Sequence, residues 1–182
     1  MEKSSKFMLI FLLSAAIIFG TVVGISYLPR RIHQEFSGIE LLLASEDDYE
    51  ILQMTNILIY GRVRYGMFAS FPIFAGSIEV STYDFTLDNP NLGIHFVNGF
   101  SMGGSMSYPV LERSYSGSGH LTRIDTLGML YTNEDFSSIV IHLFEWTYLG
   151  GGSRQGHPGN RFIVAPATDG SFALDVLRTK KY

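Results

Sequence analysis

Cysteine is absent from this chain of 182 residues. Disulfide bonds are therefore excluded, and no thiolate can act as a nucleophile or bind zinc. The missing thiol also excludes the lipid-modified cysteine that anchors a lipoprotein after signal cleavage. The absence fits either side of a membrane, so it assigns no compartment.

Histidine spacings typical of metal sites are missing as well. The five histidines form no H-x-H, H-x-x-H or H-E-x-x-H pattern, and the chain has no twelve-residue EF-hand loop. His95 and His142 fall in strand-like segments and would meet only if those strands were neighbours. We expect exposed side chains that alternate with apolar ones. The sequence therefore predicts no metal ion and no cofactor.

Positive charge is scarce beyond the N-terminal region. From Ile32 onward the chain has nine Lys and Arg residues and sixteen Asp and Glu residues, which gives a net charge of −7. An acidic domain repels phosphate groups, so we expect no nucleic-acid partner. The same charge argues against this part of the chain lying flat on anionic lipid.

One long apolar run stands near the N-terminus. Phe7–Leu28 holds 22 residues without a charge. A helix that rises ~1.5 Å per residue needs ~20 apolar residues to cross a ~30 Å hydrocarbon core. We therefore predict an N-terminal tail over 1–6 and a transmembrane helix over 7–28, with the lipid bilayer as partner. A cleaved signal peptide is the alternative, but its best cleavage site, Gly24-Ile25-Ser26, is a poor match.

The charges beside the apolar run nearly balance across it. Lys3 and Lys6 precede the run, whereas Arg30, Arg31 and His33 follow it. The positive-inside rule therefore gives little preference. The short tail resembles the start of a secretory signal, and a long domain translocates largely regardless of its own charge. We expect a single-pass protein of the cell membrane with its C-terminal domain on the extracytoplasmic side.

The remainder of the chain is predicted to be one β-rich domain. We expect a juxtamembrane linker over 29–37 and an extracytoplasmic domain over 38–182. Glycine, aromatic and β-branched residues are abundant there and favour strands and turns. Apolar and polar residues alternate in Ile57–Tyr65 and again in Phe74–Tyr83, which predicts two half-buried strands paired as a hairpin.

The order of the segments predicts a mainly β fold. About seven to nine strands follow one another without intervening helices, which indicates an antiparallel sandwich or meander. Asn98–Ser107 reads as a loop or a strand with bulges, and Gly150–Gly159 reads as a flexible loop. Asp169 is placed to cap a C-terminal helix over Ser171–Leu177. The apolar side expected for this helix comprises Phe172, Ala173, Val176 and Leu177.

One motif suggests an active site. Gly99-Phe100-Ser101-Met102-Gly103 matches G-x-S-x-G, the turn that raises the nucleophilic serine of α/β-hydrolases. Candidate partners follow in the order of that family. Asp125 or Asp135 would be the acid, and His142 or His157 would be the base. The catalytic set of this alternative is Ser101, His142 and Asp125.

The surroundings of the motif argue against a hydrolase. The nucleophile turn must open into a helix, but Ser105-Met106-Ser107-Tyr108-Pro109 has little helix propensity and ends in proline. No alternating strands and helices precede the motif to build a parallel sheet. We therefore favour a Gly/Ser loop or a bulged strand without a catalytic role.

The aromatic residues have two interpretations. Several tyrosines and the tryptophan Trp146 lie in strand-like segments, and packing inside the domain accounts for most of them. A few beside Gly150–Gly159 would form an exposed patch for a glycan or a peptide. Packing is the favoured interpretation.

Five short segments resemble those of small, single-span, β-rich surface proteins of Gram-positive bacteria. They are Ile59-Tyr60-Gly61, Phe74-Ala75-Gly76-Ser77-Ile78-Glu79-Val80, Gly128-Met129-Leu130-Tyr131 with Asp135-Phe136, and Val164-Ala165-Pro166-Ala167. The similarity covers most of Ile51–Leu177. It implies a cell-surface location and a β-rich shape, and it transfers no catalytic residues.

The function expected from the sequence is non-enzymatic. We predict a membrane-anchored domain that binds a protein or glycan ligand at the cell surface. A small serine esterase or lipase that uses Ser101 is one alternative. An accessory subunit of a membrane complex is another, and it would leave an apolar patch exposed on the isolated chain.

Overall fold

The fold is mainly β, with a helix at each end of the described chain. A computed structural model describes residues 2–26, 28–45, 48–65, 72–87, 92–96, 103–113, 119–133, 135–148 and 154–180. The elements are α1 (Glu2–Ser26), β1 (Arg30–Leu43), β2 (Tyr49–Tyr65), β3 (Pro72–Val80), the short 3₁₀ helix η1 (Asp84–Thr86), β4 (Leu92–His95), β5 (Gly104–Arg113), β6 (Gly119–Thr132), β7 (Ile139–Tyr148), β8 (Arg154–Ala165) and α2 (Gly170–Lys180). The expected β-rich class with a C-terminal helix is confirmed.

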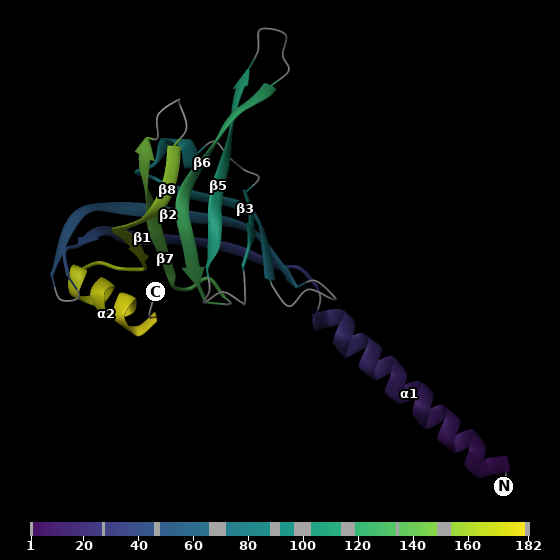
Figure 1. Ribbon diagram of the computed structural model, residues 1–182. Helices are drawn as coiled ribbons and strands as arrows, with labels where there is room; N and C mark the ends of the chain where they lie inside the picture. Colours follow the sequence, from purple (N-terminus) through teal and green to yellow (C-terminus); the bar gives the residue numbers. More distant parts are fainter. Residues whose placement is uncertain are drawn as a thin grey trace.

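All eight of these strands belong to one antiparallel sheet. Their order is β4-β3-β2-β1-β8-β7-β6-β5, so consecutive strands are neighbours within β1–β4 and within β5–β8, and the pairing of β1 with β8 joins the two sets. The two edge strands, β4 and β5, lie close together, and the sheet is nearly closed (Figure 1). Of the two predicted topologies, the meander is the one observed.

The predicted hairpin is present and its alternation is correct. β2 pairs with β3 in a register that sets Ile59 opposite Ile78. Ile57, Ile59 and Val63 are buried, while Arg62 and Arg64 are exposed. The period of two therefore identified the buried face of the strand.

The expected linker over 29–37 is wrong from Arg30 onward. β1 begins at Arg30, and its pairing with β2 starts there, opposite Val63. Ile32 is buried in the core, so the segment is held by packing as well as by main-chain hydrogen bonds. The β domain therefore begins at residue 30 rather than at 38.

The expected loop over Gly150–Gly159 is wrong for residues 154–159. These residues form the first half of β8, where Arg154 pairs with Tyr148 and His157 with Glu145. Strong strand formers in β7 provide the ladder that overrides the local glycine content. For Asn98–Ser107, residues 104–107 lie in β5, whose register shifts between Met106 and Ser107. The strand alternative is therefore confirmed for these four residues, although the extra residue at the shift, Leu127, lies in β6, while 97–102 lie outside the described residues.

Two apolar cores lie on the two faces of the sheet. The inner core fills the curled sheet, and the outer core lies between α2 and the outer face of β1, β7 and β8. The largest inner side chains with no exposed surface are Phe74, Phe96, Tyr108, Phe136, Ile57 and Ile59. The outer core comprises Ile39, Leu41, Val140, Phe162, Val164, Ala167, Ala173 and Leu177.

Helix α2 has the predicted cap, but it runs over Gly170–Lys180 rather than Ser171–Leu177, and its buried side differs. Asp169 Oδ1 accepts a hydrogen bond from the Phe172 amide at 2.8 Å and caps the helix. Ala173 and Leu177 are buried as expected, together with Leu174, whereas Phe172 is 49% exposed. The side of α2 that meets the sheet is therefore centred about one residue later than predicted.

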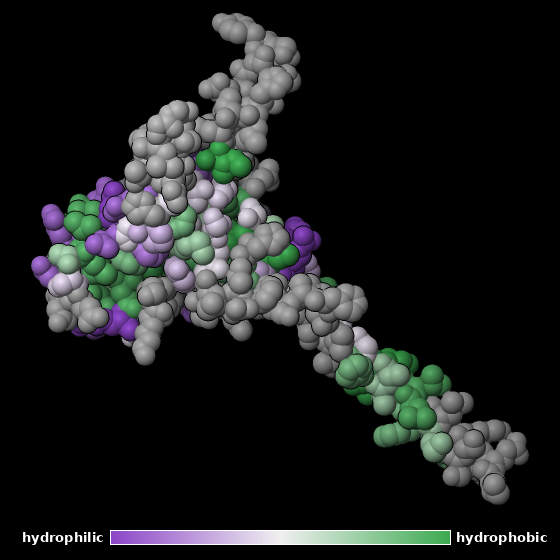
Figure 2. Space-filling model, in the orientation of Figure 1, coloured by the Kyte–Doolittle hydropathy of each residue, from purple (hydrophilic) through white to green (hydrophobic). Residues whose placement is uncertain are grey.

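Helix α1 leaves the sheet at the start of β1 and projects away from it (Figure 1). Its apolar residues, including Phe7, Phe11 and Phe19, are exposed (Figure 2). Over the part of the chain that the structure describes, no helix has the length and apolar character that a membrane crossing requires. A transmembrane role for 7–28 therefore stays a prediction from the sequence.

Candidate functional site

The candidate site is centred on a carboxylate with no exposed surface. Glu40 lies in β1 between Ile39 and Leu41, which both point into the outer core. Because side chains alternate along a strand, Glu40 points to the inner face of the sheet. A buried charge is costly unless it is paired and hydrogen-bonded, so its surroundings must compensate it.

Three side chains from three other segments compensate Glu40. Gln53 Nε2 in β2 donates to Oε2 at 2.7 Å, and the Tyr83 hydroxyl, after β3, donates to Oε1 at 3.2 Å. From β8, Arg161 Nε donates to Oε1 at 3.0 Å, and Arg161 Nη2 contacts the same oxygen. We call these four residues the Glu40 network.

Two irregularities of the sheet flank the Glu40 network. The β1–β2 register shifts between Glu40 and Leu41, which leaves Leu52 as an extra residue in β2. The β7–β8 register shifts between His142 and Phe144, opposite residues 159–161 of β8. Bulges of this kind redirect side chains and are frequent beside functional sites. Here the second one includes Arg161, whose side chain reaches Glu40.

Electrostatics favour the protonated forms of two members of the network, Tyr83 and Arg161. Burial raises the pKa of the Tyr83 phenol, and the charge of Glu40 raises it further. Tyr83 therefore stays protonated and donates to the carboxylate. Partial burial lowers the pKa of Arg161, but its hydrogen bond to Glu40 and the charges of Glu40 and Glu145 more than offset this, so the pKa of Arg161 is raised overall.

Solvent reaches the network through Arg161. Its side chain is 40% exposed, whereas that of Glu40 is fully buried. The bonds to Glu40 use Nε and Nη2, and Nη1 carries two further N–H donors. A guanidinium fixed in this way is suited to bind an oxygen acceptor without losing much side-chain entropy. The arrangement can thus recognise a carbonyl, carboxylate or hydroxyl group.

A cluster of hydroxyl groups lies beside the network. Thr55 Oγ1, two residues after Gln53 in β2, lies 3.2 Å from Ser81 Oγ and 3.1 Å from Thr82 Oγ1. Thr82 directly precedes Tyr83. Within the described ranges, no group of three or more His, Asp or Glu side chains is placed to hold a metal ion.

The structure does not bring the candidate hydrolase residues together. Ser101 lies outside the described residues. Asp125 in β6 pairs with Tyr108, whose side chain is in the inner core. His142 in β7 stacks on Phe162 of the outer core, with ring centroids 4.3 Å apart. Since paired residues share a face of a sheet, Asp125 and His142 lie on opposite faces.

The remaining histidine hypothesis also finds no support in the topology. His95 lies in β4 and His142 in β7, which are not neighbours in the sheet. His142 Nε2 donates to the carbonyl oxygen of Gly159 at 2.7 Å, which ties it to the irregular part of β8.

Sequence reasoning missed the Glu40 network. The usable signal was a single acidic residue inside an apolar segment, Gly38–Ala44, that reads as a buried strand. A charge at such a position demands a partner. The partner itself, Arg161, stands 121 positions away, and no local pattern identifies it.

Comparisons with known proteins give no relative to draw on. No family model matches the chain, and neither the curated proteins nor the solved structures contain a match. The resemblance to Gram-positive surface proteins therefore stays a prediction.

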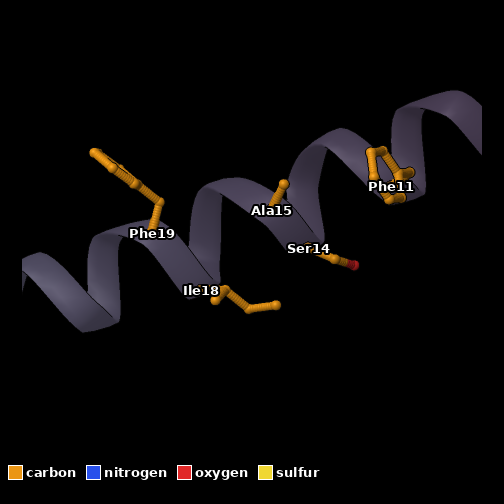
Figure 3. Close-up of a pocket in the computed structure, with 5 residues that line it drawn as sticks. All are labelled: Phe11, Ser14, Ala15, Ile18 and Phe19. Carbon is orange, nitrogen blue, oxygen red and sulfur yellow. The ribbon is translucent and has the colours of Figure 1, made fainter.

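A separate apolar depression lies on α1 alone. Figure 3 shows the five residues that line it: Phe11, Ser14, Ala15, Ile18 and Phe19. Small side chains at 14 and 15 lie between larger ones, which produces a hollow on the helix surface. It contains no charged group, so chemistry at this place is limited to apolar packing.

Proposed function

We propose that this protein is a non-enzymatic binding domain, held at the cell membrane by residues 7–28, that recognises a partner with the Glu40 network. The observation that carries the proposal is the fixed, partly exposed Arg161 on a fully buried Glu40. A buried charge in a small domain is expensive. Recognition of a partner would explain why the protein retains this ion pair, since an apolar pair at the same place would be buried at a lower cost in free energy.

The position of the network suits a domain that faces away from a membrane. Arg30 begins β1 directly after α1, and Glu40 lies ten residues further along the same strand. At ~3.3 Å per residue, this separation is about 33 Å. With α1 as anchor, the network stands at the end of the sheet far from the bilayer, where a partner can reach it.

The membrane part of the proposal rests on the uncharged run Phe7–Leu28 and on the exposed apolar side chains of α1. Water does not favour an isolated helix with aromatic and aliphatic residues on all sides, whereas lipid does. We place the C-terminal domain on the extracytoplasmic side, since the long domain after a short tail favours that orientation.

The acidic charge of the domain limits the chemical classes of ligand that it can bind. A net charge of −7 from Ile32 onward disfavours polyanions. The acceptor that docks on Arg161 is therefore a neutral carbonyl or hydroxyl oxygen, as in a peptide main chain or a glycan.

Site-specific photo-crosslinking in intact cells tests this function. Glu50 and Arg161 both pair with Leu42, from opposite sides, so a p-benzoylphenylalanine at position 50 lies beside the network. We expect adducts from position 50 that are lost with Arg161→Lys, which keeps the charge but not the planar fork. The matched control places the same group at Phe172, on α2. Equal adducts from both positions, unaffected by Arg161→Lys, would contradict the proposal.

Two simpler assays check its other parts. Protease added to intact cells should digest the β domain, which follows residue 29. Full protection of that domain from the protease would refute the extracytoplasmic location. The purified full-length chain should not hydrolyse p-nitrophenyl esters. Turnover that disappears in Ser101→Ala would favour the serine hydrolase instead.

A further inference from the structure

Three arginines gather on the outer face of the sheet, at the end where α1 enters it. Arg31 in β1 lies directly opposite Arg62 in β2, and Arg64 follows two residues later in β2. All three side chains are exposed. Val63, between Arg62 and Arg64, points into the inner core, so its two neighbours point outward. Figure 1 shows β1 and β2 extending toward α1 at this end. We call Arg31, Arg62 and Arg64 the basic patch.

The basic patch has no counter-charge in the part of the chain that the structure describes. Like charges directly opposite each other on neighbouring strands destabilise a sheet, which applies to Arg31 and Arg62. Among the described residues, no ion pair joins these guanidinium groups to a carboxylate. Arg30 differs, because alternation turns it to the other face and its charge acts on Asp135. An anion from outside the chain would therefore relieve the repulsion within the patch.

Acidic residues on the same face of the sheet lie further from α1. Glu35 of β1 and Glu79 of β3 are the cross-strand neighbours of Leu58, which precedes Arg62 by four residues. At ~3.3 Å per residue this separation is about 13 Å, whereas charges are screened over about 8 Å at physiological ionic strength. The patch therefore presents local positive charge on an acidic domain. The net charge argues against the whole domain lying flat on anionic lipid, but it does not apply to this corner.

The chain itself holds the basic patch near the end of α1. Arg31 stands five residues after Ser26, the last residue of α1, and three after Leu28, the last residue of the apolar run. Because an extended chain spans at most ~3.6 Å per residue, Arg31 lies within about 11 Å of Leu28. The β1–β2 ladder then places Arg62 beside Arg31. With residues 7–28 in a bilayer, the patch is within reach of the lipid headgroups at any tilt of α1.

An exposed aromatic ring borders the basic patch. Tyr60 precedes Arg62 by two residues in β2 and is 65% exposed. Its ring meets that of His33 edge-on, with the centroids 5.7 Å apart. Tyrosine is enriched at the headgroup level of membranes, because its ring is apolar and its hydroxyl is polar. Tyr60 and the basic patch thus form one surface suited to a phosphate-bearing headgroup.

We propose that the basic patch and Tyr60 bind the headgroups of anionic lipids beside α1 and hold the start of the sheet on the membrane surface. The inference rests on the membrane anchor of the proposed function and goes beyond it, because it assigns a lipid class to a specific surface. Guanidinium groups are suited to phosphate oxygens, which they bind through two parallel N–H donors. Contact at this end leaves the Glu40 network, further along β1, accessible to a partner.

Quenching of a tryptophan by labelled headgroups tests the contact. The full-length chain carries Trp146→Phe, which removes its one tryptophan, and Tyr60→Trp, and it is placed in phosphatidylcholine nanodiscs that contain a lipid with a spin-labelled headgroup. We expect about twofold stronger quenching when roughly a third of the lipid is phosphatidylglycerol. Equal quenching with and without phosphatidylglycerol would overturn the proposal.

A matched control position lies on the same face of the same strand. Met54 is 62% exposed and stands six residues before Tyr60, which is about 20 Å along β2. In the Trp146→Phe chain with Met54→Trp in place of Tyr60→Trp, we expect no rise in quenching with phosphatidylglycerol. An equal rise at both positions would show that the whole face approaches the lipid and would overturn the proposal.

Charge substitutions assign the effect to the arginines. Arg62→Gln combined with Arg64→Gln should abolish the rise in quenching at position 60. Arg62→Lys combined with Arg64→Lys should retain most of it, because lysine keeps the charge that anionic lipid attracts. Arg178→Gln removes an exposed charge from α2 and should have no effect. A rise that survives both glutamine substitutions would overturn the proposal.

Two changes of solution separate lipid from a soluble ligand. Sodium chloride at about 1 M shortens the screening length to about 3 Å and should remove the rise in quenching. Free glycerol phosphate at unchanged ionic strength should not remove it, and a loss in that case would identify a soluble phosphate as the ligand and overturn the proposal. A chain that enters neither kind of nanodisc would refute the membrane anchor together with this inference. A chain that enters both without any lipid preference would refute this inference alone.

Discussion

Arg161 and Glu40 stand 121 positions apart in the sequence, and the Arg161 Nε donates to Glu40 Oε1 at 3.0 Å on the inner face of the sheet. The two residues lie in β8 and β1, whose ladder joins the first four strands to the last four. This ion pair therefore stabilises the β1–β8 junction between the first four strands and the last four.

We predict that Arg161→Met destabilises the protein. Removing one partner of a fully buried ion pair costs about 3–5 kcal/mol, and the partial exposure of Arg161 reduces this to about 2–3 kcal/mol. Urea unfolding of the full-length chain in micelles measures the loss. Arg178→Met is the control, since its pair with Asp175 is exposed at 3.8 Å and should change stability by less than about 0.5 kcal/mol. Equal losses in both variants would show that Glu40 is compensated without Arg161.

A second prediction concerns Phe136, which has no exposed surface and a φ of 58°. A left-handed backbone is unusual for a bulky residue, so packing must hold it there. Its ring lies 5.4 Å from Phe74 and 6.0 Å from Phe96, measured between centroids. Phe136→Ala should therefore cost about 3–5 kcal/mol of unfolding free energy. The same change at half-exposed Phe172 should cost less than about 1 kcal/mol, and a similar loss at both positions would refute a special role for Phe136.

The parts of the fold that follow a local pattern could be predicted from the sequence. Alternation set the buried residues of β2 and β3, and Asp169 marked the start of α2. The first residues of β1 and the first half of β8 could not be predicted, because their strand conformation depends on ladders with Val63 and with Glu145. In both segments, pairing with a neighbouring strand overrode the local composition.

The candidate site was harder to predict than the fold. Ser101, His142 and Asp125 formed a plausible set because the motif and the order of residues matched a family pattern. The sheet places Asp125 and His142 on opposite faces, and sequence order contains no information on that. No sequence motif contains Glu40 and Arg161, because the two residues come into contact only after β1 and β8 pair.

A third prediction is an acid-sensitive attachment of α2. Hydrogen bonds from the Ser171 hydroxyl and the Phe172 amide lower the pKa of Asp169. A carboxyl with a lowered folded-state pKa stabilises the fold above its unfolded pKa of about 3.9, and the effect is lost as the pH falls through the folded-state pKa. Thermal unfolding between pH 3 and 7 should show a difference between wild type and Asp169→Ala that shrinks on acidification. A difference between wild type and Asp169→Ala that stays constant from pH 7 to pH 3 would contradict the prediction.

The last prediction separates a structural from a catalytic role for His142. Its ring stacks on Phe162 and its Nε2 donates to the Gly159 carbonyl at 2.7 Å, so both its apolar face and one nitrogen are already used. His142→Phe keeps the stacking but leaves that carbonyl without this donor, which should cost about 1–2 kcal/mol. His142→Ala also removes the stack on Phe162 and should cost about 1 kcal/mol more. If His142 were a catalytic base, the effects would differ. Both variants would abolish ester turnover, and both would unfold at the same urea concentration as wild type. Urea titration and an ester assay on the same preparations therefore distinguish the two roles, and a structural role requires a stepwise loss of stability with no turnover to lose.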